Sequence, residues 1–300
     1  MQTDLSDSSF NHKSVMTDEI LCAIKNYPSL LDNQIKGIDA TLGGGGHSYL
    51  LLKTYPNLKI IGLDQDPFAR KSALLKLEEF ESRIDIKATN FATFEPKEKV
   101  AFVIADLGVN SNQLDNPERG FSFQKDGPLD MRMNPLLEIN AEKIIETLTE
   151  KELADLIYKY GDERLSRKIS RKIKTDLKEK GKYSGTKDLA YSIAGCFPPK
   201  QRYKKIHPAT RTFQALRIAV NAEIEALENF LEIVPNWLLP GGIISIISFH
   251  SIEDRLVKNS FKSDERLKNL TKKPITPNER EIINNKRSRS AKLRIAQLNY

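Results

Sequence analysis

The chain has 300 residues, and 39% of them are hydrophobic, which is enough for a packed core and excludes a wholly disordered protein. The formal net charge is +7, and the basic residues are concentrated in two zones. Residues 158–205 hold 15 Lys and Arg against 5 Asp and Glu, and residues 255–294 hold 13 against 4. This distribution favours a localised polyanion-binding surface, although solvated lysine-rich helix faces would give the same charges.

Four strands alternating with helices are expected in the first third of the chain. A short helix at 17–26 comes first; the strands follow at 35–40, 59–64, 83–88 and 100–107, with helices at 47–54 and 68–80. Such alternation is typical of a parallel sheet with helices on both faces.

The strand rhythm stops after residue 107. Residues 110–134 are predicted to be loop and residues 141–206 helical, followed by one long helix at 208–237 and an apolar buried strand at 241–249. We therefore predict one α/β domain, formed by residues 1–114 and 207–300, with residues 115–206 as an inserted loop and all-helical domain. Two last segments, at 267–272 and 291–298, are expected to close the sheet edge.

The two cysteines, Cys22 and Cys196, have no Cys or His at metal-ligand spacing, so neither a metal site nor a disulfide framework is expected. Residues 1–11 are polar and resemble no targeting peptide, and no apolar run reaches the roughly 20 residues of a membrane-spanning helix. We expect a cytoplasmic protein that is not bound to a membrane.

Four glycines, Gly43–Gly46, follow the first strand directly and precede a helix. Glycines there let the backbone approach a ligand, and the helix N-terminus offers free N–H groups. Ser48 stands where the dinucleotide fingerprint needs a third glycine, which favours a nucleoside-type cofactor over a pyrophosphate; a flexible turn is the alternative. Asp64 ends the second strand and can accept hydrogen bonds from a ribose, whereas Asp66, just before a proline, is the better N-cap of the next helix.

Asp106 ends the fourth strand, so the ends of strands 1, 2 and 4 should converge on one cleft. The Pro-Pro-aromatic segment that amino-methyltransferases commonly carry there is missing, and the residues so far indicate a nucleoside-cofactor enzyme and no more. After the last long strand, Ser251 with Asp254 predicts a capping box.

Six stretches together resemble the bacterial 16S rRNA (cytosine-N4)-methyltransferase family, over residues 12–291. They are HKSVM from His12, the glycine loop, PERGFSF from Pro117, DGPLDMRM from Asp126, HPATRTFQALRI from His207 and SIISFHSIEDR from Ser245. Their number and order make a chance match implausible.

The resemblance implies an α/β class I S-adenosylmethionine-dependent methyltransferase sheet, Rossmann-like, with an inserted all-helical domain. The cofactor would be S-adenosylmethionine, and the substrate a cytosine N4 amine in the decoding region of 16S rRNA, in the small ribosomal subunit. The cofactor positions carried over from the family are Gly45, Gly46, His47, Asp64, Phe91, Asp106 and Gln113. The loop from Val109 to Gln113 departs from the family's usual Val-Ser-Ser-Pro-Gln, beside the expected target base.

Methyl transfer to a delocalised amine benefits from precise positioning and from an acceptor for an amine proton. Asp106 and Asn110 are the catalytic candidates, because they lie at or just beyond the end of strand 4. The candidate RNA contacts are Arg119, Arg132, Arg211, Lys286, Arg287 and Arg289. The oligomeric state is left open, with a homodimer among the options.

Three other functions remain open from the sequence. They are a non-catalytic RNA-binding ribosome-assembly factor that retains the cofactor fold, a methyltransferase acting on DNA or a free nucleotide, and a nicotinamide oxidoreductase. Intact Gly45, Gly46, Asp64 and Asp106 oppose the first, the basic zones and the resemblance oppose the second, and the missing third glycine opposes the last.

Overall fold

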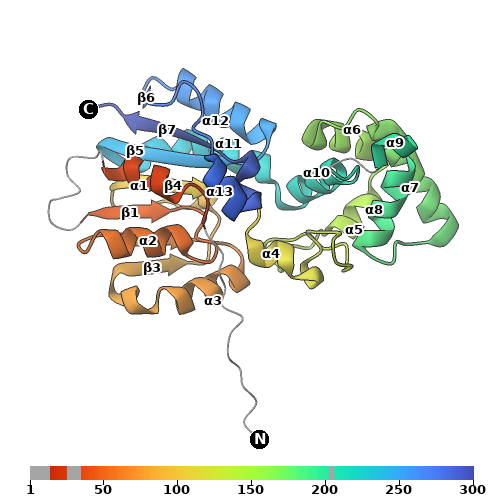
Figure 1. Ribbon diagram of the computed structural model, residues 1–300, viewed down its shortest axis with the longest axis horizontal. Helices are drawn as coiled ribbons and strands as arrows, with labels where there is room; N and C mark the ends of the chain where they lie inside the picture. Colours follow the sequence, from red (N-terminus) through yellow and green to blue (C-terminus); the bar gives the residue numbers. More distant parts are fainter. Residues whose placement is uncertain (1–13, 26–34, 203–205) are drawn as a thin grey trace, which may run out of the picture.

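The computed structural model describes residues 14–25, 35–202 and 206–300 of the chain. It has two lobes, one built around a sheet and one made of helices (Figure 1). Helices α4 (Ser111–Asp115) and α13 (Glu279–Asn284) lie at the edge of the sheet lobe that faces the helical lobe. Within the described ranges, no helix is both long and apolar enough to cross a membrane.

The sheet lobe contains seven strands in the order β3-β2-β1-β4-β5-β7-β6. Their bounds are β1 Lys36–Asp39, β2 Lys59–Leu63, β3 Ile84–Lys87, β4 Val100–Asp106, β5 Leu238–Ser248, β6 Leu267–Asn269 and β7 Lys292–Leu298. Strands β1 to β5 pair in parallel, and β7 runs antiparallel to both β5 and β6. The predicted parallel sheet and its closing segments are confirmed, and the strand order reverses between β1 and β4, where open α/β sheets bind ligands.

Alternating side chains of β4 anchor the two layers of helices on the sheet. Phe102 and Ile104 pack in the cluster that holds α1 (Thr17–Lys25), α2 (Gly46–Thr54) and α3 (Pro67–Lys76). On the other face, Val103 and Ala105 pack in the cluster that holds α11 (Glu223–Ile233) and α12 (Ser251–Ser263). This period of two is the strand periodicity expected of a sheet covered on both sides.

The helical lobe has its own apolar core. Its helices are α5 Ala141–Thr147, α6 Glu150–Gly161, α7 Ser166–Lys180, α8 Thr186–Gly195, α9 Pro199–Arg202 and α10 Thr210–Asn221. Ile157, Ile169 and Ile193 are fully buried there, together with Phe213 and Leu216 of α10. Because α10 packs within this core, we propose that the inserted unit extends past the predicted boundary at residue 206, to Asn221.

Two local predictions are wrong. The single long helix expected at 208–237 is instead α10, α11 and a short 3-10 turn at Val234–Trp237, because Ala222 between α10 and α11 adopts a left-handed conformation with φ 48°. The segment expected to be loop after β4 contains α4 and a 3-10 turn at Pro117–Arg119. Both features lie where the two lobes meet.

Candidate functional site

A cavity of about 670 Å³ lies at the carboxyl ends of β1, β2 and β4. That volume is within the range of small-molecule and cofactor sites, roughly 300–1,000 Å³. One side is formed by the glycine loop and by residues after β2 and β4. The lining also includes Met133, Arg217, Glu223, Phe249 and Glu253.

The glycine loop shapes one wall through its backbone. Gly43 and Gly45 have φ of 53° and 78°, in the left-handed region that favours glycine. A Cβ on Gly45 would lie 2.9 Å from Leu77 Cδ1, and one on Gly46 would overlap the Ser14 hydroxyl. Helix α2 begins at Gly46 with no side-chain cap, so its first N–H groups remain available to an anionic ligand.

Asp64 lies in the cavity wall directly after β2. Its Oδ2 accepts a hydrogen bond from Gly43 N and its Oδ1 accepts one from Asp66 N, both at 2.8 Å. Burial raises the pKa of Asp64 from 3.8 to about 6, against the lowering effect of these two N–H donors. Each carboxylate oxygen can still accept a second hydrogen bond, as a ribose diol would supply.

Asp106, which is partly exposed, and the buried His47 form a polar pair at the end of β4. Asp106 Oδ2 lies 3.6 Å from His47 Nε2, and Asp106 N donates to Thr41 Oγ1 at 2.6 Å. Burial opposes protonation of His47, but the Asp106 carboxylate outweighs it and the pKa of His47 is raised. Among the described residues, neither Asp106 Oδ1 nor His47 Nε2 has a hydrogen-bond partner. Unpaired buried polar atoms in a cavity wall indicate a ligand, because leaving them unsatisfied costs free energy.

Phe91 supplies an apolar surface on the same side of the cavity. It begins the 3-10 turn Phe91–Thr93 and packs edge to face against Phe230, with the ring centroids 5.0 Å apart. Leu63 and Leu107 line the cavity with it. This surface suits a flat, weakly polar ring such as adenine.

Asn110 and Gln113 form the capping box of α4. Asn110 Oδ1 accepts from Gln113 N at 2.9 Å, and Gln113 Oε1 accepts from Asn110 N at 3.0 Å. Gln113 Nε2 also donates to Asp66 Oδ2 at 2.7 Å. Gln113 lines the cavity, but these bonds favour a role in positioning α4 over the predicted direct contact with the cofactor.

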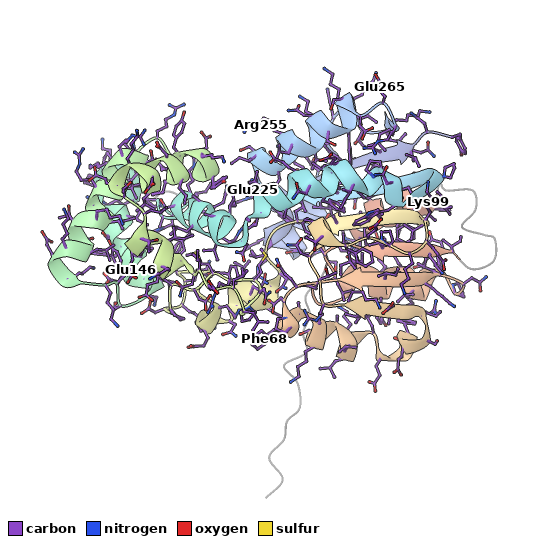
Figure 2. The ribbon with its side chains drawn as sticks, turned by 180° about the vertical axis from the view of Figure 1, so that it is seen from behind. Phe68, Lys99, Glu146, Glu225, Arg255 and Glu265 are labelled. Carbon is purple, nitrogen blue, oxygen red and sulfur yellow. The ribbon has the colours of Figure 1, made fainter. Side chains whose placement is uncertain are left out.

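Asp66 caps α3, as predicted, by accepting a hydrogen bond from Phe68 N at 2.9 Å. It also forms a buried ion pair with Arg119, whose Nη1 lies 2.9 Å from Asp66 Oδ2. The Arg119 guanidinium stacks over Phe68, which Figure 2 labels, and donates to the Arg132 and Met133 carbonyls. Arg119 is only 9% exposed, so its placement favours a structural role over the predicted RNA contact.

Arg132 is engaged in a similar way. Its guanidinium makes two hydrogen bonds to the Asp130 carboxylate, at 2.7 and 2.8 Å, and one to the Leu137 carbonyl at 2.6 Å. The nearby guanidinium outweighs partial burial and holds the pKa of Asp130 below its usual value. These bonds fold the loop before α5 and leave Arg132 little capacity for RNA.

The other RNA candidates are exposed and lie on both lobes. Arg211 lies on α10 and donates to the Asp162 carbonyl at 2.8 Å. Lys286, Arg287 and Arg289 lie on the 3-10 turn Lys286–Ser290. Arg287 alone of these four lines the cavity, where it donates to the Ser111 hydroxyl and pairs with Asp115.

Sequence reasoning missed three charged groups that line the cavity. Arg217 and Glu223 form a bidentate ion pair there, and Glu253 lies in the same wall. Arg217 and Glu223 come together because the helix breaks between them at Ala222. The sequence carries no glycine or proline signal for that break. The predicted capping box of Ser251 with Asp254 is also wrong, since His250 caps α12 with Glu253 as its partner.

Comparison with known proteins identifies the family. The sequence profile of the MraW methylase family matches residues 9–299. The chain belongs to this family. A relative from Prochlorococcus marinus subsp. pastoris, named ribosomal RNA small subunit methyltransferase H, is 84% identical over 99% of this chain and 100% of its own length. A second relative of that name, from another Prochlorococcus marinus strain, is 57% identical over 99% of this chain and 97% of its own.

Among solved structures, an rRNA methylase from Streptococcus thermophilus is similar over 94% of this chain and 96% of its own, at 10% identity and a TM-score of 0.44. That likeness is too weak to add to the family match. The family match shows a methyltransferase, and the sheet is the covered α/β sheet predicted from the sequence.

Proposed function

We propose that this protein transfers a methyl group from S-adenosylmethionine to the exocyclic N4 amine of a cytosine in the decoding region of 16S rRNA, in the small ribosomal subunit. The relatives' names support a small-subunit ribosomal RNA as the acceptor. The observation that carries the reaction is the unpaired Asp106 Oδ1 at the end of β4, in a cavity that also contains Asp64 and the glycine loop. Action on ribosomal RNA agrees with the predicted cytoplasmic location.

The residues of the cavity fit S-adenosylmethionine. The unpaired Asp106 Oδ1 suits its cationic amino group, and the α2 N-terminus at Gly45 and Gly46 suits its carboxylate. Asp64 has the acceptors for its ribose hydroxyls, and Phe91 the apolar face for its adenine. When bound, the cofactor supplies an electrophilic methyl group.

The protein's task is to present a weakly nucleophilic amine, whose lone pair is delocalised into the ring. We infer that Asp106 Oδ1, which is unpaired and lines the cavity, accepts a hydrogen bond from that amine or from the cofactor's amino group. Asn110 Oδ1 is engaged in the capping box, so its Nδ2 is the group left to face a base, and it is a donor. That donor matches cytosine N3, the acceptor next to the amine. Together, the hydrogen bonds from Asp106 and Asn110 would hold the amine in line for transfer.

The basic turn at Lys286–Ser290 supplies the RNA contacts in this proposal. Lys286 and Arg289 are exposed, and Arg287 reaches the cavity mouth. Phosphate contacts at these positions would give affinity that falls with salt and would guide the target nucleotide to the cavity, into which it would be extruded. Arg211, on the helical lobe, is a further candidate for contact with the RNA backbone.

The proposal is tested with purified protein, labelled S-adenosylmethionine and small ribosomal subunits that lack the modification, with naked 16S rRNA in parallel. We expect label in the subunits or the RNA with the wild type and at least 100-fold less with Asp106→Ala, which removes the unpaired acceptor. Incorporation with neither RNA, despite measured cofactor binding, would exclude small-subunit rRNA as the acceptor. Absence of cofactor binding would instead favour a non-catalytic assembly factor.

A further inference from the structure

Arg217 occupies an unusual place for a charged side chain. It lies on α10 in the cavity wall, and only 16% of its side chain is exposed. Its Nε and Nη2 each donate to Glu223 at 2.8 Å, from one side of the break at Ala222 to the other. Glu225, labelled in Figure 2, marks the start of α11, where the chain passes from the helical lobe to the sheet lobe.

Asn221 fixes the backbone at Arg217 to the loop that contains Met131 and Met133. Asn221 Nδ2 donates to the carbonyls of Arg217 and Met131, and Asn221 Oδ1 accepts from Met133 N at 2.7 Å. The negative charge of Glu253 also stabilises the charged guanidinium. The end of α10 and the loop opposite are thereby fixed to each other beside the cavity.

This network is costly unless it serves a purpose. Burying an ion pair removes both charges from water, and such pairs often contribute little to stability compared with apolar residues of similar size. The bidentate bond with Glu223 satisfies Nε and Nη2 but not Nη1, for which no described residue supplies a hydrogen-bond partner. Arg217 lines the cavity and 16% of its side chain is exposed, so Nη1 is the group that we expect to be available to a ligand.

We propose that Arg217 Nη1 donates a hydrogen bond to O2 of the target base and so determines specificity for cytosine. This inference rests on the proposed function, because it assumes a cytosine amine as the acceptor. Of the two roles inferred for Asp106 Oδ1, the one that accepts from the base amine completes the donor–acceptor order along the base edge, with donors from Asn110 and Arg217 for N3 and O2.

Adenine also carries an exocyclic amine beside a ring nitrogen acceptor, so Asp106 and Asn110 alone would not reject it. The position that corresponds to cytosine O2 is a C–H in adenine. A buried guanidinium opposite a C–H would lose its hydrogen bond, and sites built to hydrogen-bond a substrate group reject analogues that lack it. Glu223 acts through Arg217 as its positioning residue.

The experiment combines a change in the base with a change in the protein. Small subunits are reconstituted with 16S rRNA that carries either cytidine or 2-thiocytidine at the methylated position, since sulfur is a poor hydrogen-bond acceptor. kcat/KM is measured for the wild type and for the double variant Arg217→Gln/Glu223→Gln, which removes both charges and leaves no carboxylate unpaired. Arg167→Gln is the control for the loss of an arginine elsewhere on the protein, because Arg167 is an exposed residue of α7 that pairs with Asp155.

For each protein, the sulfur effect is the ratio of kcat/KM for cytidine to kcat/KM for 2-thiocytidine. We expect this ratio to be about tenfold or more larger in the wild type and in Arg167→Gln than in the double variant. Any intrinsic effect of sulfur on the amine appears in every protein and cancels in this comparison. An equal effect of sulfur in all three proteins would overturn the assignment of Arg217 to O2. If the double variant also loses cofactor binding or thermal stability, the apolar double variant Arg217→Met/Glu223→Leu, which has no donor at position 217, repeats the comparison, and an unchanged sulfur effect in it likewise overturns the proposal.

The two proposals fail in different ways. If the wild type forms no N4-methylcytidine on the cytidine-containing subunits, the proposed function fails. If it forms N4-methylcytidine and the sulfur effect does not depend on Arg217, only the inference about O2 fails.

Discussion

Replacing Asp64 by asparagine tests the cofactor side of the cavity most sharply. The ionised Asp64 accepts hydrogen bonds from Gly43 N and Asp66 N and has acceptor capacity left for a ribose diol. In Asp64→Asn one oxygen becomes an NH2 group, which faces one of these N–H donors and offers the ribose a donor. Loss of a hydrogen bond to a charged group costs about 1.5–3 kcal/mol, so the dissociation constant for S-adenosylmethionine should rise about 10- to 100-fold.

The same carboxylate predicts how binding depends on pH. Because its pKa in the free protein is about 6, Asp64 is ionised above that pH and protonated below it. Ribose donors favour the ionised form, so affinity should be level above pH 7 and weaken below pH 6, by up to about tenfold for each pH unit. For stability the sign is opposite: the raised pKa means that Asp64 opposes folding when ionised. That penalty is absent below about pH 4 and reaches about 3 kcal/mol above pH 6.

Isothermal titration calorimetry from pH 5 to pH 8 measures the affinity, with S-adenosylhomocysteine as a stable ligand. Asp85→Asn is the matched control, since Asp85 is an exposed aspartate of β3 paired with Lys87. Any pH dependence left in Asp64→Asn reports His47, whose pKa is also raised. Equal affinities of Asp64→Asn and wild type at pH 8 would refute the ribose contact.

Four further substitutions test the residues that support the site and its RNA contacts. Gly45→Ala should lower the unfolding free energy in urea by about 1–3 kcal/mol, because φ is 78° and the new Cβ would press on a leucine. Asp66→Ala should lower it by about 3–5 kcal/mol by leaving a buried arginine unpaired, whereas Asp155→Ala, at an exposed pair, should change it by less than about 1 kcal/mol. Lys286→Gln and Arg289→Gln should each reduce the slope of log K against log salt for RNA binding by about 0.7–0.9, measured by fluorescence anisotropy; slopes equal to the wild type would show that neither side chain contacts phosphate.

The sheet could be predicted because its signals are local. Strand 4 reads as an unbroken apolar run, the glycine loop follows strand 1 directly, and Asp66 precedes a proline that starts a helix. Each signal lies within a few residues of the feature that it predicts. The convergence of Asp64 and Asp106 then follows from the parallel arrangement alone, since parallel strands end at one edge.

The Arg217–Glu223 pair and the burial of Arg119 could not be predicted, because these contacts are long-range or depend on a helix break that the sequence does not mark. Nothing in the sequence around Ala222 signals a left-handed residue, so Arg217 and Glu223 were placed along one continuous helix. Arg119 is a basic residue in a loop, and only the fold brings it onto Asp66, 53 positions earlier in the chain. Its burial turns an apparent RNA contact into an internal ion pair.

The identity of the methylated nucleoside tests the account most directly. Subunits methylated by the wild-type protein are digested to nucleosides, and the labelled product is identified by chromatography and mass spectrometry against standards. The account predicts label in N4-methylcytidine, at one position in the decoding region. Label in a C5-methylated or ribose-methylated nucleoside, or in a methylated adenosine, would contradict it.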